Sequence, residues 1–137
     1  MSGAVFYAAA GMGRPVRGRA LVASDGFSAR YDLDRIRGVF SRPEHKLAGE
    51  SYRGRILILD AAKGGVATAW MLHEMASRGV VPAALVLNRA NPIMVQGAAL
   101  AGFTMISGFD TDITKAIPNG AEVEIDPTAE RPFIRLL

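Results

Sequence analysis

The spacing of apolar positions along the chain predicts short strands that alternate with helices. Residues 55–61 form an apolar run with β-branched members, which is typical of a strand buried on both faces. Across residues 66–78 the apolar positions recur at helical spacing, and Gly79 is a favourable residue to end that helix. Residues 83–87 form a second apolar strand. The pattern therefore indicates a strand, a helix and a strand in succession.

The same alternation continues toward the C-terminus. Asn91 followed by Pro92 predicts the start of a helix over residues 93–101, with the asparagine as its N-cap. Residues 104–106 form a third short apolar strand. Strands joined by helices in this way pair in parallel. We therefore expect an α/β fold with a central parallel β-α-β-α-β unit.

Strand patterns also flank this unit on both sides. Residues 16–23 alternate in polarity, and residues 121–125 and 133–137 predict a closing hairpin. We expect these flanking strands to form or extend a second sheet. Residues 1–13 are small and apolar and predict a flexible or loosely packed lead-in. Residues 24–46 are polar and weakly periodic and predict a long excursion, and a loop of that length is more often functional than idle.

Composition narrows the function classes. A length of 137 residues predicts one domain over residues 1–137. The chain has no cysteine, which excludes disulfides, thiol catalysis and thiolate ligation of zinc or an iron–sulfur cluster by this chain. With only two histidines, we expect no metal site within the chain. No run approaches the roughly 20 apolar residues of a membrane span, so we expect a cytoplasmic protein that binds no membrane.

The net charge of +3 is unevenly distributed. Residues 14–55 contain ten Lys and Arg residues against five acidic residues. A basic half indicates an acidic substrate, an acidic partner or nucleic acid, although a solvated basic surface explains most of these residues equally well. Aromatic residues are sparse among the basic ones, and no nucleic-acid-binding motif is present. We therefore expect no nucleic acid among the partners.

The turn between residues 61 and 66 is the strongest candidate for a binding site. Lys63, Gly64 and Gly65 follow a buried strand and lead directly into a helix that begins at Val66. Glycines let the backbone approach a ligand closely, and a helix N-terminus presents free N–H groups to an anion. The spacing matches neither a P-loop nor a dinucleotide-binding fingerprint. A plain turn with glycines for packing is the alternative interpretation.

Two further turns are expected at the same edge of the sheet, where ligands bind in open α/β folds. Asn91 is a candidate substrate ligand there, although capping its helix explains it on its own. The third turn carries Asp110 and Asp112. These acids are candidates for a general base and a metal ligand. The simpler interpretation, which we favour, is that Asp112 caps a short helix over residues 113–117 and Asp110 is solvated.

The basic excursion and the first helix add three candidates. Arg30 can pair bidentately with a substrate carboxylate, or form a surface ion pair with a neighbouring aspartate. Ser28 lies two residues before it and carries a hydroxyl. Trp70 can anchor a partner protein, or pack under a neighbouring loop. No Ser-His-Asp set or carboxylate pair can be assembled, so the chain looks like part of a site that a second polypeptide completes.

Two runs of sequence resemble a known family. They are LAGESYRGRILIL over residues 47–59 and RGVVPAALVLNRANPIMVQGA over residues 78–98, with a glycine turn and a helix between them. Together they resemble the small subunit of aconitase X, the swivelling domain of the aconitase-like dehydratases. The resemblance covers roughly residues 13–125 and is most specific over residues 47–97.

This resemblance implies a swivelling β/β/α domain, related to the fourth domain of aconitase, that packs across a large subunit. It implies an iron–sulfur cluster on that large subunit, where a metal polarises the leaving hydroxide, and no cofactor on this chain. It implies dehydration of a small anionic hydroxy acid, with cis-3-hydroxy-L-proline as the expected substrate and mevalonate 5-phosphate as the alternative. The substrate would be bound by Lys63, Gly64, Gly65, Val66, Asn91 and Arg30. A binding or scaffold domain without catalytic residues is a further alternative.

One departure from the family concerns the catalytic base. Many relatives carry a serine-rich turn of the form G-S-S-T-G-S where this chain reads GGVATA over residues 64–69. Aconitase-type chemistry uses a serine alkoxide there to remove the α-proton, and neither Gly65 nor Val66 has a hydroxyl. Thr68 is the remaining hydroxyl of the turn, and Ser28 is the other candidate on this chain. The large subunit is the third possible source of the base.

Overall fold

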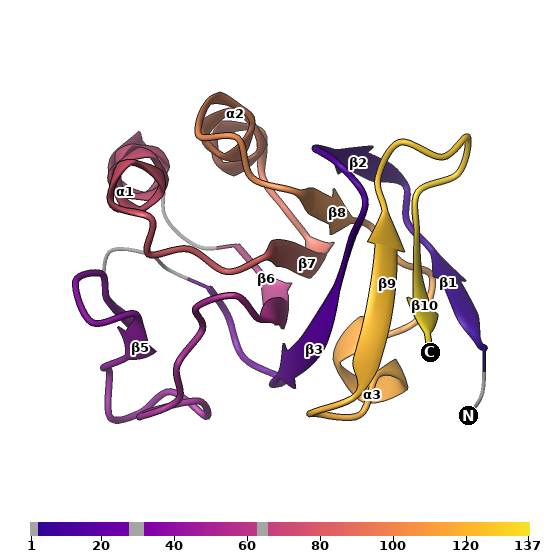
Figure 1. The fold of residues 1–137 in the computed structure, drawn as a ribbon, viewed down its shortest axis with the longest axis horizontal. Helices are drawn as coiled ribbons and strands as arrows, with labels where there is room; N and C mark the ends of the chain where they lie inside the picture. Colours follow the sequence, from indigo (N-terminus) through magenta and orange to yellow (C-terminus); the bar gives the residue numbers. More distant parts are fainter. Residues whose placement is uncertain (1–2, 28–31, 63–65) are drawn as a thin grey trace.

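The computed structural model describes residues 3–27, 32–62 and 66–137. Among these residues, eight strands form one sheet in the order β1-β10-β9-β3-β6-β7-β8-β2, and β4 and β5 form a separate two-stranded ladder (Figure 1). The strands are β1 Val5–Tyr7, β2 Ala10–Met12, β3 Val16–Val22, β4 Leu33–Asp34, β5 Val39–Phe40, β6 Ile56–Ala61, β7 Ala84–Arg89, β8 Met105–Ser107, β9 Glu122–Asp126 and β10 Phe133–Leu136. The helices are α1 Val66–Arg78, α2 Pro92–Leu100 and α3 Ile113–Ala116.

The central parallel unit is confirmed. β3 pairs in parallel with β6, β6 with β7, and β7 with β8. Helices α1 and α2 connect β6 to β7 and β7 to β8, as the sequence predicts. The hairpin of β9 and β10 is also confirmed, with Ile125 opposite Ile134 in its antiparallel register.

The flanking strands extend the central sheet, in place of the second sheet that the sequence suggested. Val16 to Arg19 in β3 pair antiparallel with β9, and Ala20 to Val22 pair in parallel with β6. One strand therefore belongs to both halves of the sheet. β1 and β2 follow each other in the chain but lie at opposite ends of the strand order. The sheet consequently curls until its two edges meet at the connection between them.

The prediction of a loosely packed lead-in was wrong for residues 5–12. β1 pairs with β10 and β2 pairs with β8. In the connection, the Ala8 N–H donates to the Pro132 carbonyl at 2.8 Å and the Ala9 N–H donates to the Gly108 carbonyl at 2.8 Å. The small apolar residues suit this position because two sheet edges have to approach each other closely there. Pairing also satisfies backbone groups that two exposed edges would leave open.

Alternating side chains of β6 divide the core into two. Leu57 and Leu59 pack in one cluster with Leu72 and Met75 of α1. Ile56 and Ile58 point to the opposite face and join a second cluster that includes Ile113 of α3, Val123 and Ile125. The second cluster fills the inside of the curled sheet, while α1 and α2 cover its outer face (Figure 1). The protein therefore has three layers, β/β/α, which confirms the predicted fold class.

The excursion between β3 and β6 is packed rather than extended into solvent. Leu33, Phe40 and Tyr52 are buried and belong to the same cluster as the inner face of α1. An ion pair of 3.4 Å joins Arg35 to Glu74 of α1. Residues 32–52 thus cover the side of α1 that α2 leaves open.

None of the helices in the described part of the chain has the length and apolar character that a membrane span requires.

Helices α1 and α2 approach each other most closely at Gly97. A Cβ placed on Gly97 would lie 2.5 Å from the Ala69 Cβ and 2.7 Å from the Ala69 Cα. Glycine destabilises a helix interior by about 1 kcal/mol relative to alanine. The lack of room for a side chain against Ala69 explains why glycine stands here all the same. The close approach lets the two helices lie side by side over β6 and β7, with their N-termini at one edge of the sheet.

We expect Gly97→Ala to destabilise the fold despite the better helix propensity of alanine. The added methyl meets backbone atoms of Ala69, which cannot rotate away, and such overpacking typically costs about 1–3 kcal/mol. The free energy of unfolding, measured by urea denaturation, should fall by that amount. Ala99→Gln on the exposed face of α2 is the matched control and should stay within about 0.5 kcal/mol of wild type. A more stable Gly97→Ala variant would contradict the packing described.

Candidate functional site

The carboxyl ends of β3, β6, β7 and β8 lie at one edge of the sheet, because all four strands run in parallel. The chain leaves this edge through residues 23–27 after β3, and enters helices α1, α2 and α3 after the other three strands. The N-termini of α1 and α2 therefore face the same edge, with the partial positive charge that suits an anion. We call this region the carboxyl edge.

Five of the predicted site residues lie outside the described residues. They are Ser28, Arg30, Lys63, Gly64 and Gly65. Val66 and Thr68 lie in the first turn of α1, which begins at the predicted residue. Of the predicted site residues that the structure describes, only Asn91 has a described side chain. The roles assigned to the other seven therefore stay predictions.

The residues that lead into the two predicted segments lie side by side. Phe27 and Ala62 form a parallel bridge, and the Phe27 N–H donates to the Ala61 carbonyl at 2.9 Å. Ser28 is the next residue after Phe27, and Lys63 is the next after Ala62. Chain connectivity therefore starts both segments from neighbouring points on the carboxyl edge. Phe27 is fully buried, which holds this junction in the core.

Asn91 acts as the N-cap of α2. Its backbone is extended, and its side-chain Oδ1 accepts the Met94 N–H at 2.8 Å. This confirms the simpler of the two interpretations, that Asn91 caps its helix. The turn before it joins the glycine turn, because the Ala62 N–H donates to the Arg89 carbonyl at 3.1 Å. Asn91 therefore lies at the same edge as Ala62, and its role as a substrate ligand stays a prediction.

The sequence analysis missed Arg89, the last residue of β7. Its side chain is 77% exposed, and its guanidinium lies 3.6 Å from the carboxylate of Asp60 at the end of β6. It adds a cation to the carboxyl edge, next to the turn that begins at Ala62. A basic residue directly after an apolar parallel strand was the available signal, because that position always reaches this edge.

A polar network lies on the inner face of the same edge. The Asn88 amide nitrogen donates to Asp60 at 3.0 Å and to Asp112 at 2.9 Å. The Asn88 oxygen accepts the Ile113 N–H at 2.8 Å, and the Thr114 hydroxyl donates to Asp112 at 2.6 Å. Asp112 also accepts the Thr114 N–H, which confirms that it caps α3. The network fixes α3 across the ends of β6 and β7.

The network also sets the charge of Asp112. The hydrogen bond from the Thr114 side chain, followed by that from Asn88, lowers the pKa of the carboxyl below its ordinary value of 3.8. A carboxylate with a lowered pKa adds stability above its unfolded-state pKa, and that stability is lost as the pH falls through the folded-state pKa.

We therefore expect wild type and Asp112→Asn to differ in stability at neutral pH and to converge in acid. The difference in the free energy of unfolding should shrink as the pH falls from about 4 toward the lower folded-state pKa, because the unfolded carboxyl then binds a proton that the native carboxylate does not. Urea unfolding followed from pH 7 down to pH 3 measures it. A difference that stays constant across this range would show that the charge of Asp112 contributes nothing.

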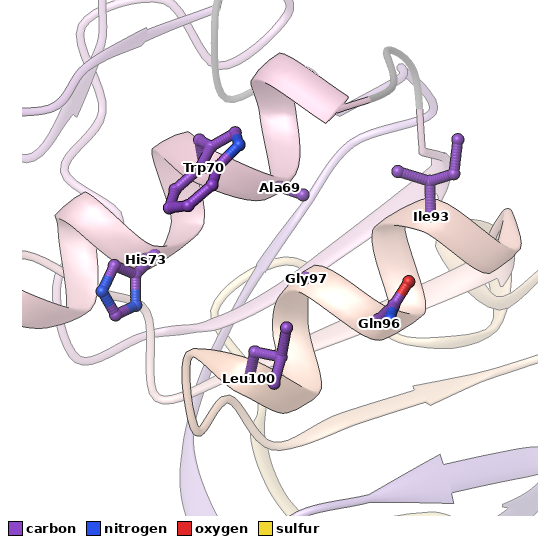
Figure 2. Close-up of a pocket in the computed structure, with 7 residues that line it drawn as sticks. All are labelled: Ala69, Trp70, His73, Ile93, Gln96, Gly97 and Leu100. Carbon is purple, nitrogen blue, oxygen red and sulfur yellow. The ribbon is translucent and has the colours of Figure 1, made fainter.

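A groove of about 460 Å³ separates the exposed sides of α1 and α2. Figure 2 shows Trp70 and His73 of α1 on one side, with Ile93, Gln96 and Leu100 of α2 on the other. Trp70 is 68% exposed, so it does not pack under a neighbouring loop as one interpretation held. The groove is mostly apolar, and its role as a partner contact stays a prediction.

The chain offers no set of side chains for an iron–sulfur cluster. The sequence contains no cysteine, and the described residues contain no group of three His, Asp or Glu side chains placed to hold a metal ion. The side chains of the described residues therefore do not fit an iron–sulfur cluster, and no chemical step is assigned to a cluster on this chain.

Comparison with known proteins adds the family. The family model of the aconitase X swivel domain matches residues 6–134. The phosphomevalonate dehydratase small subunit of Methanopyrus kandleri is 33% identical over 82% of this chain and 84% of its own length. The protein of the same name from Thermococcus sibiricus is 32% identical over 83% of this chain and 85% of its own length.

Solved structures agree in fold. Thermococcus kodakaraensis aconitase X, in its holo form, superposes with a TM-score of 0.88 at 21% identity, over 98% of this chain and 99% of that one. The solution structure of a UPF0107 protein superposes with a TM-score of 0.84 at 25% identity, with the same coverage. The β/β/α layers, the match over residues 6–134 and the relatives above 30% identity place this chain in the aconitase X swivel domain family.

Proposed function

We propose that this chain is the small subunit of a heteromeric aconitase-like hydro-lyase, active only with a large subunit. It forms one wall of the active site at the carboxyl edge. The observation that carries the proposal is the bridge between Phe27 and Ala62, since it brings the chain to Ser28 and to the glycine turn from adjacent points. Family membership supplies the reaction class, because curated relatives are named dehydratase small subunits.

Dehydration next to a carboxylate needs a base for the α-proton and donors for the enolate-like charge that develops. Free N–H groups at the start of α1, after Gly64 and Gly65, suit the second task because fixed backbone dipoles need no reorganisation. Lys63 and Arg30 add positive charge for the substrate anion, and Arg89 joins them from β7. Val66 and Asn91 complete the proposed substrate contacts.

Ser28 and Thr68 are the candidate bases on this chain. Ser28 follows directly on the buried Phe27, whose backbone is bonded to β6 beside the glycine turn. Thr68 is the third residue of α1. We assign the base to Ser28, because its attachment point lies at the junction of the two segments. A hydroxyl in this role needs nearby positive charge, and Lys63 is the source that we propose for it.

The proposed substrate is mevalonate 5-phosphate. The family resemblance implied cis-3-hydroxy-L-proline, but the curated relatives reported above are named for phosphomevalonate. Arg89 at the carboxyl edge, together with the proposed contacts of Lys63 and Arg30, suits a substrate that carries a phosphate as well as a carboxylate. Hydroxyproline remains the second candidate, because the glycines replace the serine-rich turn of many relatives.

The iron–sulfur cluster belongs to the large subunit in this proposal, since this chain has no thiolate to offer. The assembled enzyme would be cytoplasmic. The small subunit would bring the substrate-binding amides and the base, and the large subunit the cluster and the remaining substrate ligands.

Turnover by the assembled enzyme tests the proposal. The purified chain and its cognate large subunit are assayed alone and mixed, with mevalonate 5-phosphate and with cis-3-hydroxy-L-proline. We expect neither chain alone to be active, and the mixture to dehydrate mevalonate 5-phosphate. Activity on hydroxyproline only would move the substrate to the second candidate. An assembled complex inactive on both would overturn the assignment of the reaction, and a large subunit fully active alone would overturn the role of this chain.

A further inference from the structure

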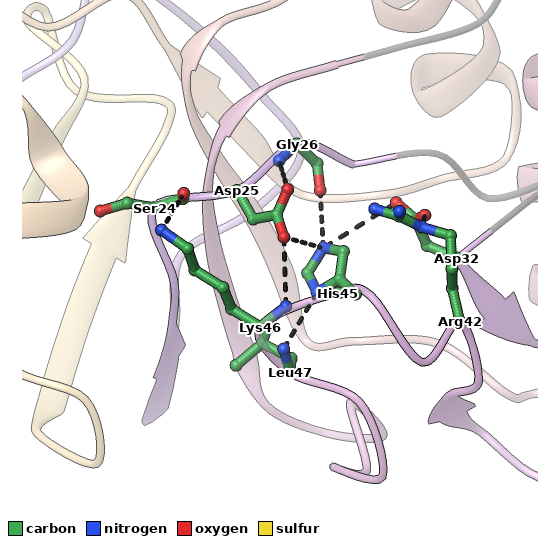
Figure 3. Close-up of polar contacts among 8 residues, drawn as sticks. All are labelled: Ser24, Asp25, Gly26, Asp32, Arg42, His45, Lys46 and Leu47. Carbon is green, nitrogen blue, oxygen red and sulfur yellow. Dashed lines mark hydrogen bonds and ion pairs between the residues drawn. The ribbon is translucent and has the colours of Figure 1, made fainter.

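A buried histidine ties the excursion to the carboxyl edge. The His45 side chain is fully buried, and its Nε2 lies 2.9 Å from the Gly26 carbonyl oxygen (Figure 3). Its Nδ1 accepts the Leu47 N–H at 3.0 Å. A backbone N–H can only donate, so Nδ1 carries no proton and Nε2–H is the donor to Gly26. The imidazole therefore links residue 26 to residues 45–47 through both of its nitrogens.

Asp25 and Lys46 reinforce the same link. One carboxylate oxygen of Asp25 accepts the Gly26 N–H at 2.8 Å, and the other accepts the Lys46 N–H at 3.1 Å. The Lys46 ammonium donates to the Ser24 carbonyl at 2.9 Å. We call His45, Asp25 and Lys46 the clamp. It fixes residues 24–26 from the side opposite to β6.

Charged groups surround the imidazole. The Asp25 and Asp32 carboxylates lie 3.8 Å and 3.9 Å from Nε2, and Arg42 pairs with Asp32 at 2.6 Å. The Phe40 ring packs against the imidazole, with centroids 4.6 Å apart. A buried ring held by this many contacts has one orientation available, so it can hold the Gly26 carbonyl in a fixed position.

The clamp acts on the junction that the proposed function depends on. The segment of residues 25–27 is bonded to β6 as well, since the Asp60 N–H donates to the Asp25 carbonyl at 2.8 Å and Phe27 bridges to Ala62. Ser28 follows directly. A shift of about 1 Å in a reacting group can cost on the order of 100-fold in rate. A brace two residues from the proposed base therefore affects catalysis without touching the substrate.

We propose that His45 is a positioning residue for the active site, acting through the Gly26 carbonyl on the segment that carries Ser28. The inference rests on the proposed function and names the contact that fixes the Phe27–Ala62 junction, which the proposed base follows in the chain.

Two substitutions separate positioning from general stability. Asn in place of His45 keeps an oxygen acceptor for the Leu47 N–H but loses the donor to Gly26. Gln reaches further and keeps a donor near the Nε2 position. We expect His45→Asn to lower the kcat of the assembled enzyme by about 10- to 100-fold with KM changed less than threefold, and His45→Gln to recover most of the loss. Ser77→Asn, at an exposed position near the far end of α1, is the control and should leave kcat unchanged.

Amide hydrogen exchange in the isolated chain gives a second measurement that needs no activity. His45→Asn should speed exchange at Phe27 and Ala62 while Val86 in β7 keeps its protection. If that pattern appears but the wild-type complex turns over neither substrate, the proposed function fails and the brace stands. Unchanged exchange at Phe27, or a wild-type kcat in a folded His45→Asn complex, would overturn the inference.

A variant on the surface covers the case in which His45→Asn does not fold. Lys46→Met removes only the bond from the ammonium to the Ser24 carbonyl, at the exposed side of the clamp. We expect it to fold, to speed exchange at Phe27 and to lower kcat several-fold. Wild-type values for both quantities would overturn the inference.

Discussion

Ser28→Ala is expected to lower the kcat of the assembled enzyme by about 10²- to 10⁴-fold, the usual contribution of a positioned proton-transfer group. The reason is the loss of the hydroxyl that takes the α-proton, while the amides at the start of α1 still bind the substrate anion. KM should therefore change much less than kcat. Steady-state kinetics of the complex with mevalonate 5-phosphate measure both parameters.

Thr68→Ala is the comparison that decides between the two hydroxyls of this chain. We expect it to lower kcat less than tenfold, because Thr68 lies two residues beyond the start of α1. A large loss in Thr68→Ala with little effect of Ser28→Ala would reassign the base to Thr68. If both variants turn over at the wild-type rate, the base belongs to the large subunit and the catalytic role of this chain is wrong.

Deleting residues 1–12 is expected to prevent stable folding. The deletion removes β1 and β2, which close the curled sheet by pairing with β10 and β8. Both edges would then be open, and the inner cluster would lose Ala8 and the contact of Phe6. The loss should exceed about 5 kcal/mol, comparable with the whole stability of many domains. Circular dichroism and urea denaturation of the truncated chain measure it.

Deleting only residues 1–3 is the matched control. It leaves Ala4, whose carbonyl accepts the Leu136 N–H at 2.9 Å, and it leaves both strands intact. We expect wild-type stability for this shorter truncation. A stable, cooperatively unfolding chain without residues 1–12 would instead support the loosely packed lead-in that the sequence pattern predicted.

Local signals made much of the fold predictable from sequence. Helix α1 begins and ends at the predicted residues, because its apolar spacing and the glycine after it are both local features. Asn91 and Asp112 cap the helices that they were predicted to cap, since each needs only the next few N–H groups. The parallel order of β6, β7 and β8 follows from the helices between them.

Long-range pairing could not be predicted in the same way. β1 and β2 are three residues each, and their partners lie about a hundred residues away, so no periodicity marks them. The clamp joins residues 25 and 45 across the excursion, and no local pattern marks the contact of the His45 ring with Phe40. Arg89 reaches the carboxyl edge only through the register of β7, and it was passed over.

The candidate site was predictable in its location more than in its residues. Sequence alone indicated the edge where strand-to-helix turns meet, and the structure brings Ala62, Arg89 and Phe27 together there. The substrate could not be read from the pattern. The resemblance implied hydroxyproline, whereas the relatives reported above are named for phosphomevalonate.

If the carboxyl edge faces substrate and the large subunit, as proposed, both should shield a thiol placed there from labelling. The natural chain has no cysteine, so Ile93→Cys in the first turn of α2 and Ser77→Cys near the far end of α1 each introduce a single thiol. Both positions are exposed.

Maleimide labelling of this chain is followed by the increase in its mass. It is measured for the chain alone, for the complex with the large subunit, and for the complex with substrate added. We expect labelling at residue 93 to be at least tenfold slower in the complex than in the chain alone, and slower still with substrate. Labelling at residue 77 should not change. Protection at residue 77 with free labelling at residue 93 would contradict it.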